Sequence, residues 1–257
     1  MLAASVALGW RLVVLAGAGV AGGVANGVAG GGTFITFPTM LALGVPALRA
    51  NVSNTVGVLP SYLPGAATYR RHASTHAATL RLLIAPSVAG SLVGCALLFA
   101  GSAQTFRVAV PYLIGAATAV FALSPWITRR LEHVSHDAPS RRRALVCAVF
   151  VAAVYGSYFG AGLGIVLLAI MAVALPFSVH ELQGLRAVLS TIIEVVAAVV
   201  FVVHGGLDWP AVAALLAGTA VGGWMGTRLI TRLSPGVVRA LVVVFGVATT
   251  LRLALSG

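Results

Sequence analysis

The stretch Asn26-Gly-Val-Ala-Gly-Gly-Gly-Thr33 interrupts a strongly apolar run, and it decides the fold. The three consecutive glycines, Gly30 to Gly32, do not continue a stable helix, because each costs about 1 kcal/mol relative to alanine. Residues 12–25 and 34–43 on either side are apolar enough to lie in a membrane. We therefore predict a broken helix. Unwound backbone at membrane depth is tolerated where protein buries it or where it lines a cavity, so the break is a candidate binding site.

The composition excludes a soluble domain. Of the 257 residues, 60% are hydrophobic and 8% are charged, and the mean hydropathy is +1.04, whereas soluble domains carry about 25% charged residues. The sequence therefore predicts an all-α polytopic membrane protein whose outer faces contact the lipid bilayer. The net charge of +11 comes from 16 arginines, with no lysine, against five acids. Most arginines lie in short loops, which indicates membrane topology and argues against binding of nucleic acid.

No motif for an enzyme, a cofactor or a metal appears. Cys95 and Cys147 lie in apolar stretches without ligand or redox spacing, so we interpret both as buried small hydrophobic residues. His133, His136 and Asp137 belong to an arginine-rich linker and have no second ligand cluster, which favours a solvated loop over a metal site. We expect no cofactor and no enzymatic activity.

The apolar segments have an uneven length distribution. Four of them are shorter than the about 20 residues that a spanning helix needs, and these four flank two glycine breaks, within 10–45 and 143–177. Discontinuous helices in corresponding positions of two halves are typical of transporters whose site lies between repeats. The segments are 10–28, 33–45, 50–69, 79–100, 106–125, 143–159, 163–177, 184–203, 210–230 and 236–255.

An internal repeat appears when the chain is aligned with itself, without a gap, so that Gly30 falls on Gly162. We call this shift the repeat offset. Chance matching explains some identities in such a chain, but it explains the matched glycines, histidine and arginine less well. The matches include Ala29, Gly30 and Gly32 with Ala161, Gly162 and Gly164, His72 with His204, Gly90 and Gly94 with Gly222 and Gly226, Ser102 with Ser234, and Arg107 with Arg239. We predict a single transmembrane transporter domain with repeat one at about 10–125, a cytoplasmic basic linker at about 126–142 and repeat two at about 143–257.

The arginines predict the relative orientation of the repeats. An even number of crossings in each half, with the amino terminus inside, places ten arginines inside and six outside. An odd number, with the amino terminus outside, places twelve inside and leaves four outside, namely Arg11, Arg49, Arg107 and Arg252. The odd count agrees better with the positive-inside rule. We therefore predict two inverted-topology repeats, each a glycine-broken pair of short helices followed by three spanning helices, with 8–10 membrane segments. Whether each broken pair spans the membrane or enters and returns stays open.

Both glycine breaks are candidate anion sites. Freed amide groups at the start of each downstream half-helix, at the positive end of its dipole, suit a small anion. Close helix packing is the alternative explanation for these glycines. Neutral donors nearby can add hydrogen bonds. The predicted substrate-binding residues of the breaks are Asn26, Gly30, Gly31, Gly32, Thr33, Ser157, Gly162 and Gly164, with Tyr155 as a further donor.

A second group of polar residues begins the next element of each half. Asn51, Asn54 and Thr55 precede Tyr62 in the first half, and the repeat offset maps Asn51, Asn54, Val58 and Tyr62 onto Gln183, Arg186, Ser190 and Glu194. An ordinary helix cap is the alternative for the asparagines. Arg186, Ser190 and Glu194 follow a spacing of four residues, so they share one helix face. We predict Asn51, Asn54, Thr55, Gln183, Arg186 and Ser190 as substrate-binding residues.

Glu194 stands inside a strongly apolar helix. A carboxylate is costly in lipid, so it is expected to face the interior or a water-filled cavity and to have a function. Burial favours the neutral acid, which makes proton carriage the expected role. For Glu194 the alternatives are a structural pair with a polar neighbour or a buried neutral acid. For Arg186 the alternative is placement at the membrane interface.

The motifs together resemble the sulfite exporter TauE/SafE family of membrane anion transporters, over nearly the whole chain. The resemblance rests on Gly27-Val-Ala-Gly-Gly-Gly-Thr-Phe-Ile-Thr-Phe-Pro38, Ala50-Asn-Val-Ser-Asn-Thr55, Tyr69-Arg70-Arg71, Tyr158-Phe-Gly-Ala-Gly-Leu-Gly164 and Gly206-Leu-Asp-Trp-Pro210. In this family an Asn-Ala-Leu-Lys-Asn-like string and a later Asn are common. This chain has Gln183-Gly-Leu-Arg-Ala187 and Glu194 there. Arginine keeps the charge but changes its shape, and the extra acid alters the expected coupling.

The resemblance implies a secondary transporter in the cytoplasmic membrane that moves a small sulfur-containing anion, such as sulfite or sulfoacetate. The expected partners are therefore this anionic substrate, the bilayer and a coupling proton or cation; the oligomeric state is not predicted. Two alternatives remain, a transporter of another small solute such as a carboxylate or a metal ion, and a membrane scaffold that transports nothing.

Overall fold

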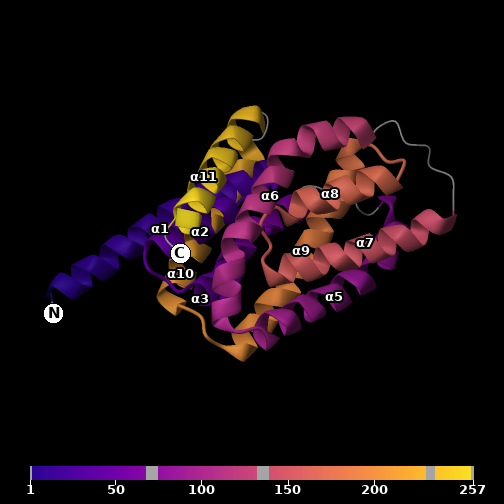
Figure 1. Cartoon of the computed structure of the whole chain (residues 1–257). Coiled ribbons are helices and arrows are strands. Elements are labelled where there is room, and N and C mark those ends of the chain that lie inside the picture. The colour runs from indigo at the N-terminus through magenta and orange to yellow at the C-terminus, as the bar shows by residue number, and fades with distance from the viewer. Residues whose placement is uncertain (1, 68–74, 132–138, 230–234, 256–257) are drawn as a thin grey trace.

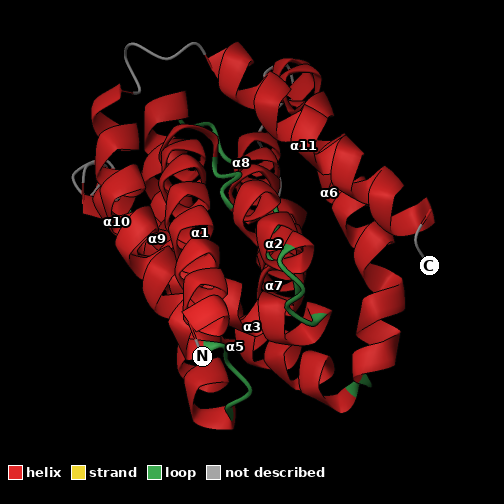
Figure 2. Cartoon of the chain, turned by 90° about the vertical axis from the view of Figure 1, so that its left-hand side faces the viewer, coloured by secondary structure: helices red, strands yellow, loops and turns green. Residues whose placement is uncertain are grey.

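The computed structural model describes residues 2–67, 75–131, 139–229 and 235–255. These residues form helices joined by short loops, without a strand, which confirms the predicted all-α class (Figure 2). The helices are α1 (Leu2–Ala29), α2 (Thr33–Ala42), α3 (Ala47–Val58), the 3-10 helix η1 (Leu59–Ser61), α5 (Ala77–Ala100), α6 (Ala103–Leu131), α7 (Pro139–Tyr158), α8 (Leu163–Ala174), α9 (Val179–His204), α10 (Trp209–Leu229) and α11 (Pro235–Leu255). His72 and the linker residues His133, His136 and Asp137 lie outside the described residues.

Both predicted glycine breaks separate two helices. Residues 30–32 end α1 before α2 begins, and residues 159–162 separate α7 from α8. With 10 and 12 residues, α2 and α8 are too short to cross a bilayer. Four described helices are long and apolar enough to do so, at Leu8–Gly27, Ala77–Ala100, Ala103–Leu123 and His180–His204.

Two helices differ in length from the sequence prediction. The predicted short first segment, 10–28, belongs to a helix of 28 residues, because α1 already begins at Leu2. The predicted spanning segment 50–69 is interrupted, since α3 ends at Val58 and a 3-10 turn follows. Pro60 lies in that turn, and proline has no N–H group to continue the helical hydrogen bonds.

Helices α5 and α9 lie side by side and point in the same direction (Figure 1). At their starts, His76 Nε2 lies 2.9 Å from Glu181 Oε1, and at their ends the rings of Phe99 and His204 stack at 3.7 Å. With 24 residues, α5 is about 36 Å long, which exceeds the about 30 Å of hydrocarbon in a bilayer. We call the end at which both helices begin the His76 face, because His76 directly precedes α5. We call the opposite end the Asp208 face, because Asp208 follows the end of α9.

The glycines set the direction of the neighbouring helices. A Cβ on Gly90 or Gly94 of α5 would meet the carbonyl oxygens of Phe150 and Val154, so α7 runs parallel to α5 and begins at the His76 face. A Cβ on Gly218, Gly222 or Gly226 of α10 would meet the carbonyl oxygens of Ala16, Val20 and Val24, so α1 runs parallel to α10 and begins at the Asp208 face.

Each glycine-broken pair therefore enters from one face and returns toward the same face. Helix α8 leads back to the start of α9 at the His76 face. Helix α2 leads back to α3, whose Ser53 accepts a hydrogen bond from the Asp208 backbone N–H at 2.8 Å. Of the two alternatives that the sequence left open, these contacts favour entry and return over full spanning.

Helix contacts in one half have equivalents in the other when the repeat offset is applied. The first residues of α3, α5 and α6 map onto the first residues of α9, α10 and α11. The packing of α1 on α10 corresponds to that of α7 on α5, while α6 packs on its own counterpart α11. Figure 2 shows α6 and α11 together at one side of the bundle. A common arrangement of the two halves is consistent with the predicted repeat.

The close contact of α1 with α10 gives a test of the packing. Gly222→Val is expected to destabilise the protein by about 1–3 kcal/mol, because the new side chain would collide with the Val20 backbone, which cannot move aside as a side chain could. Gly17→Val on α1 is the matched control, since a Cβ there meets nothing within 4 Å. Thermal unfolding of the purified variants measures the difference. Equal melting temperatures would contradict the assigned helix contact.

Candidate functional site

Buried polar residues gather in the interior between the two broken helix pairs. Glu194 lies near the middle of α9 and is 2% exposed, and Arg186 is 9% exposed. We call the set the central polar cluster, and all its members are predicted site residues. It comprises Asn26, Thr33, Asn51, Asn54, Thr55, Ser157, Arg186, Ser190 and Glu194.

Arg186 lies against the first glycine break and the first turn of α8. A Cβ built on Gly30 would lie 2.8 Å from Arg186 Nη1, and one built on Gly164 of α8 would lie 3.0 Å from the same atom. The first break also touches the start of α8, because the Cβ built on Gly30 would lie 3.4 Å from the Gly164 Cα atom. Gly30 has a φ of +73°, which L side chains rarely adopt. The guanidinium group therefore occupies a place that glycine alone leaves open.

The surroundings of Arg186 are positively polarised. Thr33 begins α2 and Leu163 begins α8, and the first N–H groups of a helix have no acceptor within it. The Phe34 and Leu163 N–H groups already donate to the carbonyl oxygens of Gly31 and Gly160, whereas none of the backbone hydrogen bonds of the described loops uses the N–H group of Thr33 or Gly164 as a donor. The amide groups at the two helix starts and the guanidinium together suit an anion.

Glu194 contacts a residue that the sequence analysis did not place in the site. The Tyr62 hydroxyl group donates a hydrogen bond to Glu194 Oε1 at 3.0 Å, while Oε2 is buried without a hydrogen-bond partner among the described residues. A Cβ on Gly160 would lie 3.6 Å from Oε1, so the second glycine break adjoins the acid. Tyr62 and Glu194 are related by the repeat offset, but correspondence between the two halves does not by itself predict that the residues touch.

Helix α3 connects the two broken pairs. Asn54 Nδ2 donates to Thr33 Oγ1 at 3.5 Å, and Asn51 Nδ2 donates to the Tyr158 carbonyl oxygen at 3.0 Å. The Oδ1 atoms of both asparagines and the hydroxyl oxygen of Ser190 are buried without a partner in the described chain. A buried unsatisfied polar group costs about 1–3 kcal/mol. These open positions suit a site that receives a polar solute or water.

Two serines that the sequence analysis did not select support the cluster. Ser61 accepts a hydrogen bond from Asn26 Nδ2 at 2.8 Å. Ser91 on α5 bonds to the Ser157 hydroxyl group at 2.5 Å and donates to the Ile193 carbonyl oxygen at 3.1 Å. A single serine, in the 3-10 turn η1 or in the apolar helix α5, carries no recognisable pattern, so only the fold reveals these two.

The remaining predicted site residues have less direct roles. Gly31 packs against the Phe121 ring and Gly32 against the Gly22 carbonyl oxygen, which explains both glycines by helix packing. Gly162 has a φ of +75° and faces the Phe34 ring, and Gln183 is half-buried. The Tyr155 hydroxyl group already donates to the Ala161 carbonyl oxygen.

The prediction that both cysteines are buried is wrong for Cys147. Cys95 is 1% exposed, but Cys147 is exposed on α7. It lies one turn before Val151, which is 64% exposed, on the side of α7 that faces outward. An apolar stretch in a membrane helix can contact lipid instead of protein, so apolar surroundings in the sequence do not imply burial.

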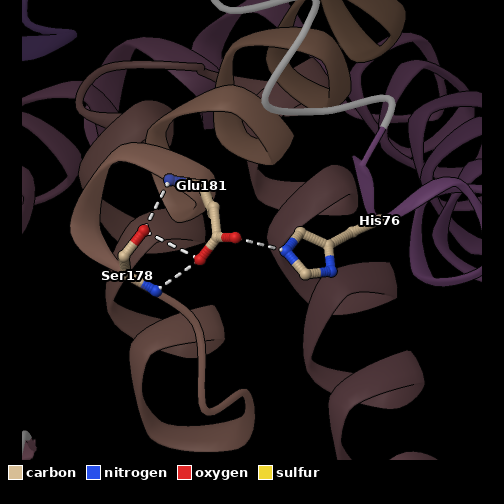
Figure 3. Close-up of polar contacts among 3 residues, drawn as sticks. All are labelled: His76, Ser178 and Glu181. Atoms are coloured by element: carbon tan, nitrogen blue, oxygen red, sulfur yellow. Dashed lines mark hydrogen bonds and ion pairs between the residues drawn. The ribbon is translucent and has the colours of Figure 1, made fainter.

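A separate polar contact joins the two halves at the His76 face. Glu181 Oε1 lies 2.9 Å from His76 Nε2, and its Oε2 accepts hydrogen bonds from the Ser178 N–H and hydroxyl groups at 2.8 Å each (Figure 3). Ser178 and Glu181 form a capping box at the start of α9. The His76 ring also stacks on Phe177 at 3.7 Å.

The glycine at the first break can be tested against a matched glycine elsewhere. Gly30 and Gly44 both have positive φ values, so alanine at either position costs about 1–2 kcal/mol of backbone strain. Only at Gly30 would the new methyl group displace Arg186, since a Cβ on Gly44 meets nothing within 4 Å. Gly30→Ala is therefore expected to lower transport at least tenfold more than Gly44→Ala, measured as solute uptake into proteoliposomes at equal protein content. Equal transport by the two variants would contradict a role for the Gly30–Arg186 contact.

An apolar helical shell around a buried polar site, enclosed by two discontinuous helix pairs, defines a class of protein, the multi-pass membrane transporters. Within this class, the chain belongs to the sulfite exporter TauE/SafE family, whose model matches residues 15–253. The predicted resemblance is thereby confirmed.

The chain is also similar to curated proteins over most of its length. A probable membrane transporter protein of Haemophilus influenzae is 21% identical over 94% of each chain. The probable membrane transporter protein YfcA of Escherichia coli K12 is 22% identical over 90% of this chain and 85% of its own. The probable membrane transporter protein ORF9 of a Sinorhizobium species is 24% identical over 90% and 87%. No solved structure matches.

Proposed function

We propose that the protein is a secondary transporter that moves a small sulfur-containing anion, such as sulfite or sulfoacetate, across the cytoplasmic membrane. The observation that carries the proposal is the position of Arg186, which is buried against Gly30 and Gly164 at the meeting point of the two broken helix pairs. The positive ends of two helix dipoles disfavour a cation at this place, and a bound anion would offset that cost.

The chemistry of the site favours an oxyanion. The planar guanidinium group offers paired N–H donors that match the oxygen spacing of such anions. Asn51, Asn54 and Ser190 are neutral and can bond the same solute without adding charge. The family description names sulfite, and sulfite carries its charge on oxygen atoms of the kind this site would bind.

Alternating access around the central polar cluster fits the direction of the helices. Helix α5 begins at the His76 face and its counterpart α10 begins at the Asp208 face, as expected for two inverted repeats. Tyr62 and Glu194 correspond in the two halves and touch each other, so they lie where the axis relating the repeats would pass. A site on that axis is equally distant from both membrane faces.

Glu194 would couple the anion to a proton. It follows Arg186 and Ser190 on one face of α9, and the Tyr62 hydroxyl group can donate to it. A buried acid close to the binding arginine can take up a proton when water reaches the site and release it on the other side. The anion and the proton would then share one pathway.

Exchange of labelled sulfite in proteoliposomes tests the proposal. Vesicles that contain the purified protein and unlabelled sulfite should accumulate external labelled sulfite, and empty vesicles should not. Accumulation of a labelled carboxylate or divalent metal in place of sulfite would assign another solute. Exchange of none of these solutes would favour a membrane scaffold.

A further inference from the structure

We propose that two equivalent polar pairs act as gates at the two mouths of the central polar cluster, His76 with Glu181 and Arg49 with Asp208, and that only one pair closes at a time. This inference rests on the transport function proposed above. It concerns residues outside the anion site, at the two ends of the helices that enclose it.

The first pair is closed in the structure. His76 immediately precedes α5 in the first half, and Glu181 lies in the first turn of α9 in the second half. Their side chains meet at 2.9 Å, so the contact joins the two halves across the His76 face (Figure 3). Ser178 holds the second carboxylate oxygen and Phe177 stacks on the imidazole ring. Ser178 thus positions the Glu181 carboxylate from within the second half, and the Phe177 ring adds a second contact between the halves.

The repeat offset maps this pair onto a second one. His76 corresponds to Asp208 and Glu181 corresponds to Arg49. In both pairs the basic residue comes from the first half and the acid comes from the second half. Each position that is basic in one pair is thus acidic in the other, and both pairs can still form a contact between a basic and an acidic side chain.

The second pair lies at the opposite face on neighbouring elements. The Asp208 N–H group donates to Ser53 Oγ at 2.8 Å, and Ser53 is one helical turn after Arg49 on α3. The length of α9, which ends at His204, separates Asp208 from Glu181. Arg49 and Asp208 therefore lie at the Asp208 face, as His76 and Glu181 lie at the His76 face.

The second pair is open in the structure. Arg49 and Asp208 are both described, and among the described residues no ion pair joins their two side chains, whereas the side chains of His76 and Glu181 are in contact. Arg49 is exposed, and Asp208 Oδ1 accepts from the Ala211 N–H at 3.2 Å. One mouth is thus joined and the other is not, which is the asymmetry that alternating access requires.

In a transporter with inverted repeats, the two halves exchange conformations to reach the state that opens to the opposite side of the membrane, and this exchange predicts the second state here. When the first half adopts the arrangement of the second, the His76–Glu181 contact opens and Arg49 reaches Asp208. Partly exposed ion pairs are weak. Each gate can therefore open within a transport cycle and biases the equilibrium between the two states without locking it.

Cross-linking in membranes tests the gates with the full chain in a Cys147→Ala background, where Cys95 is buried. One protein carries Arg49→Cys and Asp208→Cys, a second carries His76→Cys and Glu181→Cys, and a third carries all four substitutions. After oxidation, each pair is expected to form a disulfide in its own protein. In the third protein, mass spectrometry is expected to find one disulfide or the other in any molecule, and never both. Both disulfides in one molecule, or no disulfide between positions 49 and 208, would overturn the proposal.

A charge variant provides a second measurement that does not depend on four cysteines. Glu181→Gln weakens the closed gate, so it should raise the rate of cross-linking between cysteines at 49 and 208 by about two- to fivefold, the effect of an exposed ion pair. Arg142→Gln is the matched control, because Arg142 is exposed at the start of α7 on the same face. Equal rates in both variants would also overturn the gates. No solute is needed, so these results stand apart from the sulfite exchange that tests the proposed function.

Discussion

Arg186→Ala is expected to raise the KM for sulfite transport at least tenfold while the protein remains folded. The substitution removes the cation that lies against Gly30 and Gly164. A hydrogen bond to a charged group contributes about 1.5–3 kcal/mol, so the loss of one such bond weakens anion binding about 10- to 100-fold, and the loss of a paired contact weakens it further. The concentration dependence of labelled sulfite uptake in proteoliposomes measures this change.

Two variants separate charge from shape in this experiment. Arg186→Lys keeps the positive charge but lacks the planar fork, so we expect partial transport with a raised KM. Arg107→Ala removes an exposed arginine at the start of α6, outside the central polar cluster, and should transport as the unmodified protein does. If Arg186→Ala kept the KM of the unmodified protein, the arginine would not bind the anion.

The glycine break at Gly30 was predictable because its cause is local. Three adjacent glycines each cost about 1 kcal/mol in a helix. At the second break the glycines alternate with other residues, and Gly160 and Gly162 have positive φ values, which a right-handed helix does not use. The repeat offset was equally visible, and it maps the first residues of α3, α5 and α6 onto those of α9, α10 and α11. Most helices begin within about five residues of the predicted segments, but α1 begins at Leu2, well before its predicted start, and α3 ends at Val58, well before its predicted end.

The roles of individual glycines were not predictable in the same way. Gly222 and Gly30 are the same residue type in similar apolar surroundings, yet a Cβ on Gly222 would meet the Val20 backbone and a Cβ on Gly30 would meet Arg186. Only the neighbour across the helix contact distinguishes packing from a site. For the same reason Gly31, which packs on Phe121, was selected as a binding residue together with Gly30.

The pair formed by Tyr62 and Glu194 shows a further limit. The repeat offset states that the two residues correspond, but corresponding residues in a repeat are usually far apart. They touch only where the relating axis passes, and the position of that axis depends on how α3 and α9 pack. The sequence therefore indicated a functional acid in α9 without indicating its partner.

Glu194→Gln is expected to make sulfite transport independent of pH without unfolding the protein. The glutamine side chain has the shape of the acid, and its carbonyl oxygen can still accept the hydrogen bond from the Tyr62 hydroxyl group. It cannot take up or release a proton, so it resembles the protonated acid at every pH. If proton carriage by Glu194 drives the cycle, uptake driven by a proton gradient should fall at least tenfold. Exchange of sulfite at equal pH on both sides should persist.

Tyr62→Phe is the informative companion to Glu194→Gln, because it removes the hydrogen bond to the acid but leaves the acid itself. If proton carriage depends on the carboxyl group, Tyr62→Phe should retain a pH-dependent transport rate and Glu194→Gln should not. A structural role of the pair predicts a different outcome, in which both variants lose thermal stability and neither changes the shape of the pH profile. Parallel pH profiles of uptake and melting temperatures distinguish the two. Unchanged pH dependence in Glu194→Gln would exclude coupling through this acid. Any coupled proton would then have to travel bound to the sulfite anion itself, as a protonated solute of lower charge at the Arg186 site.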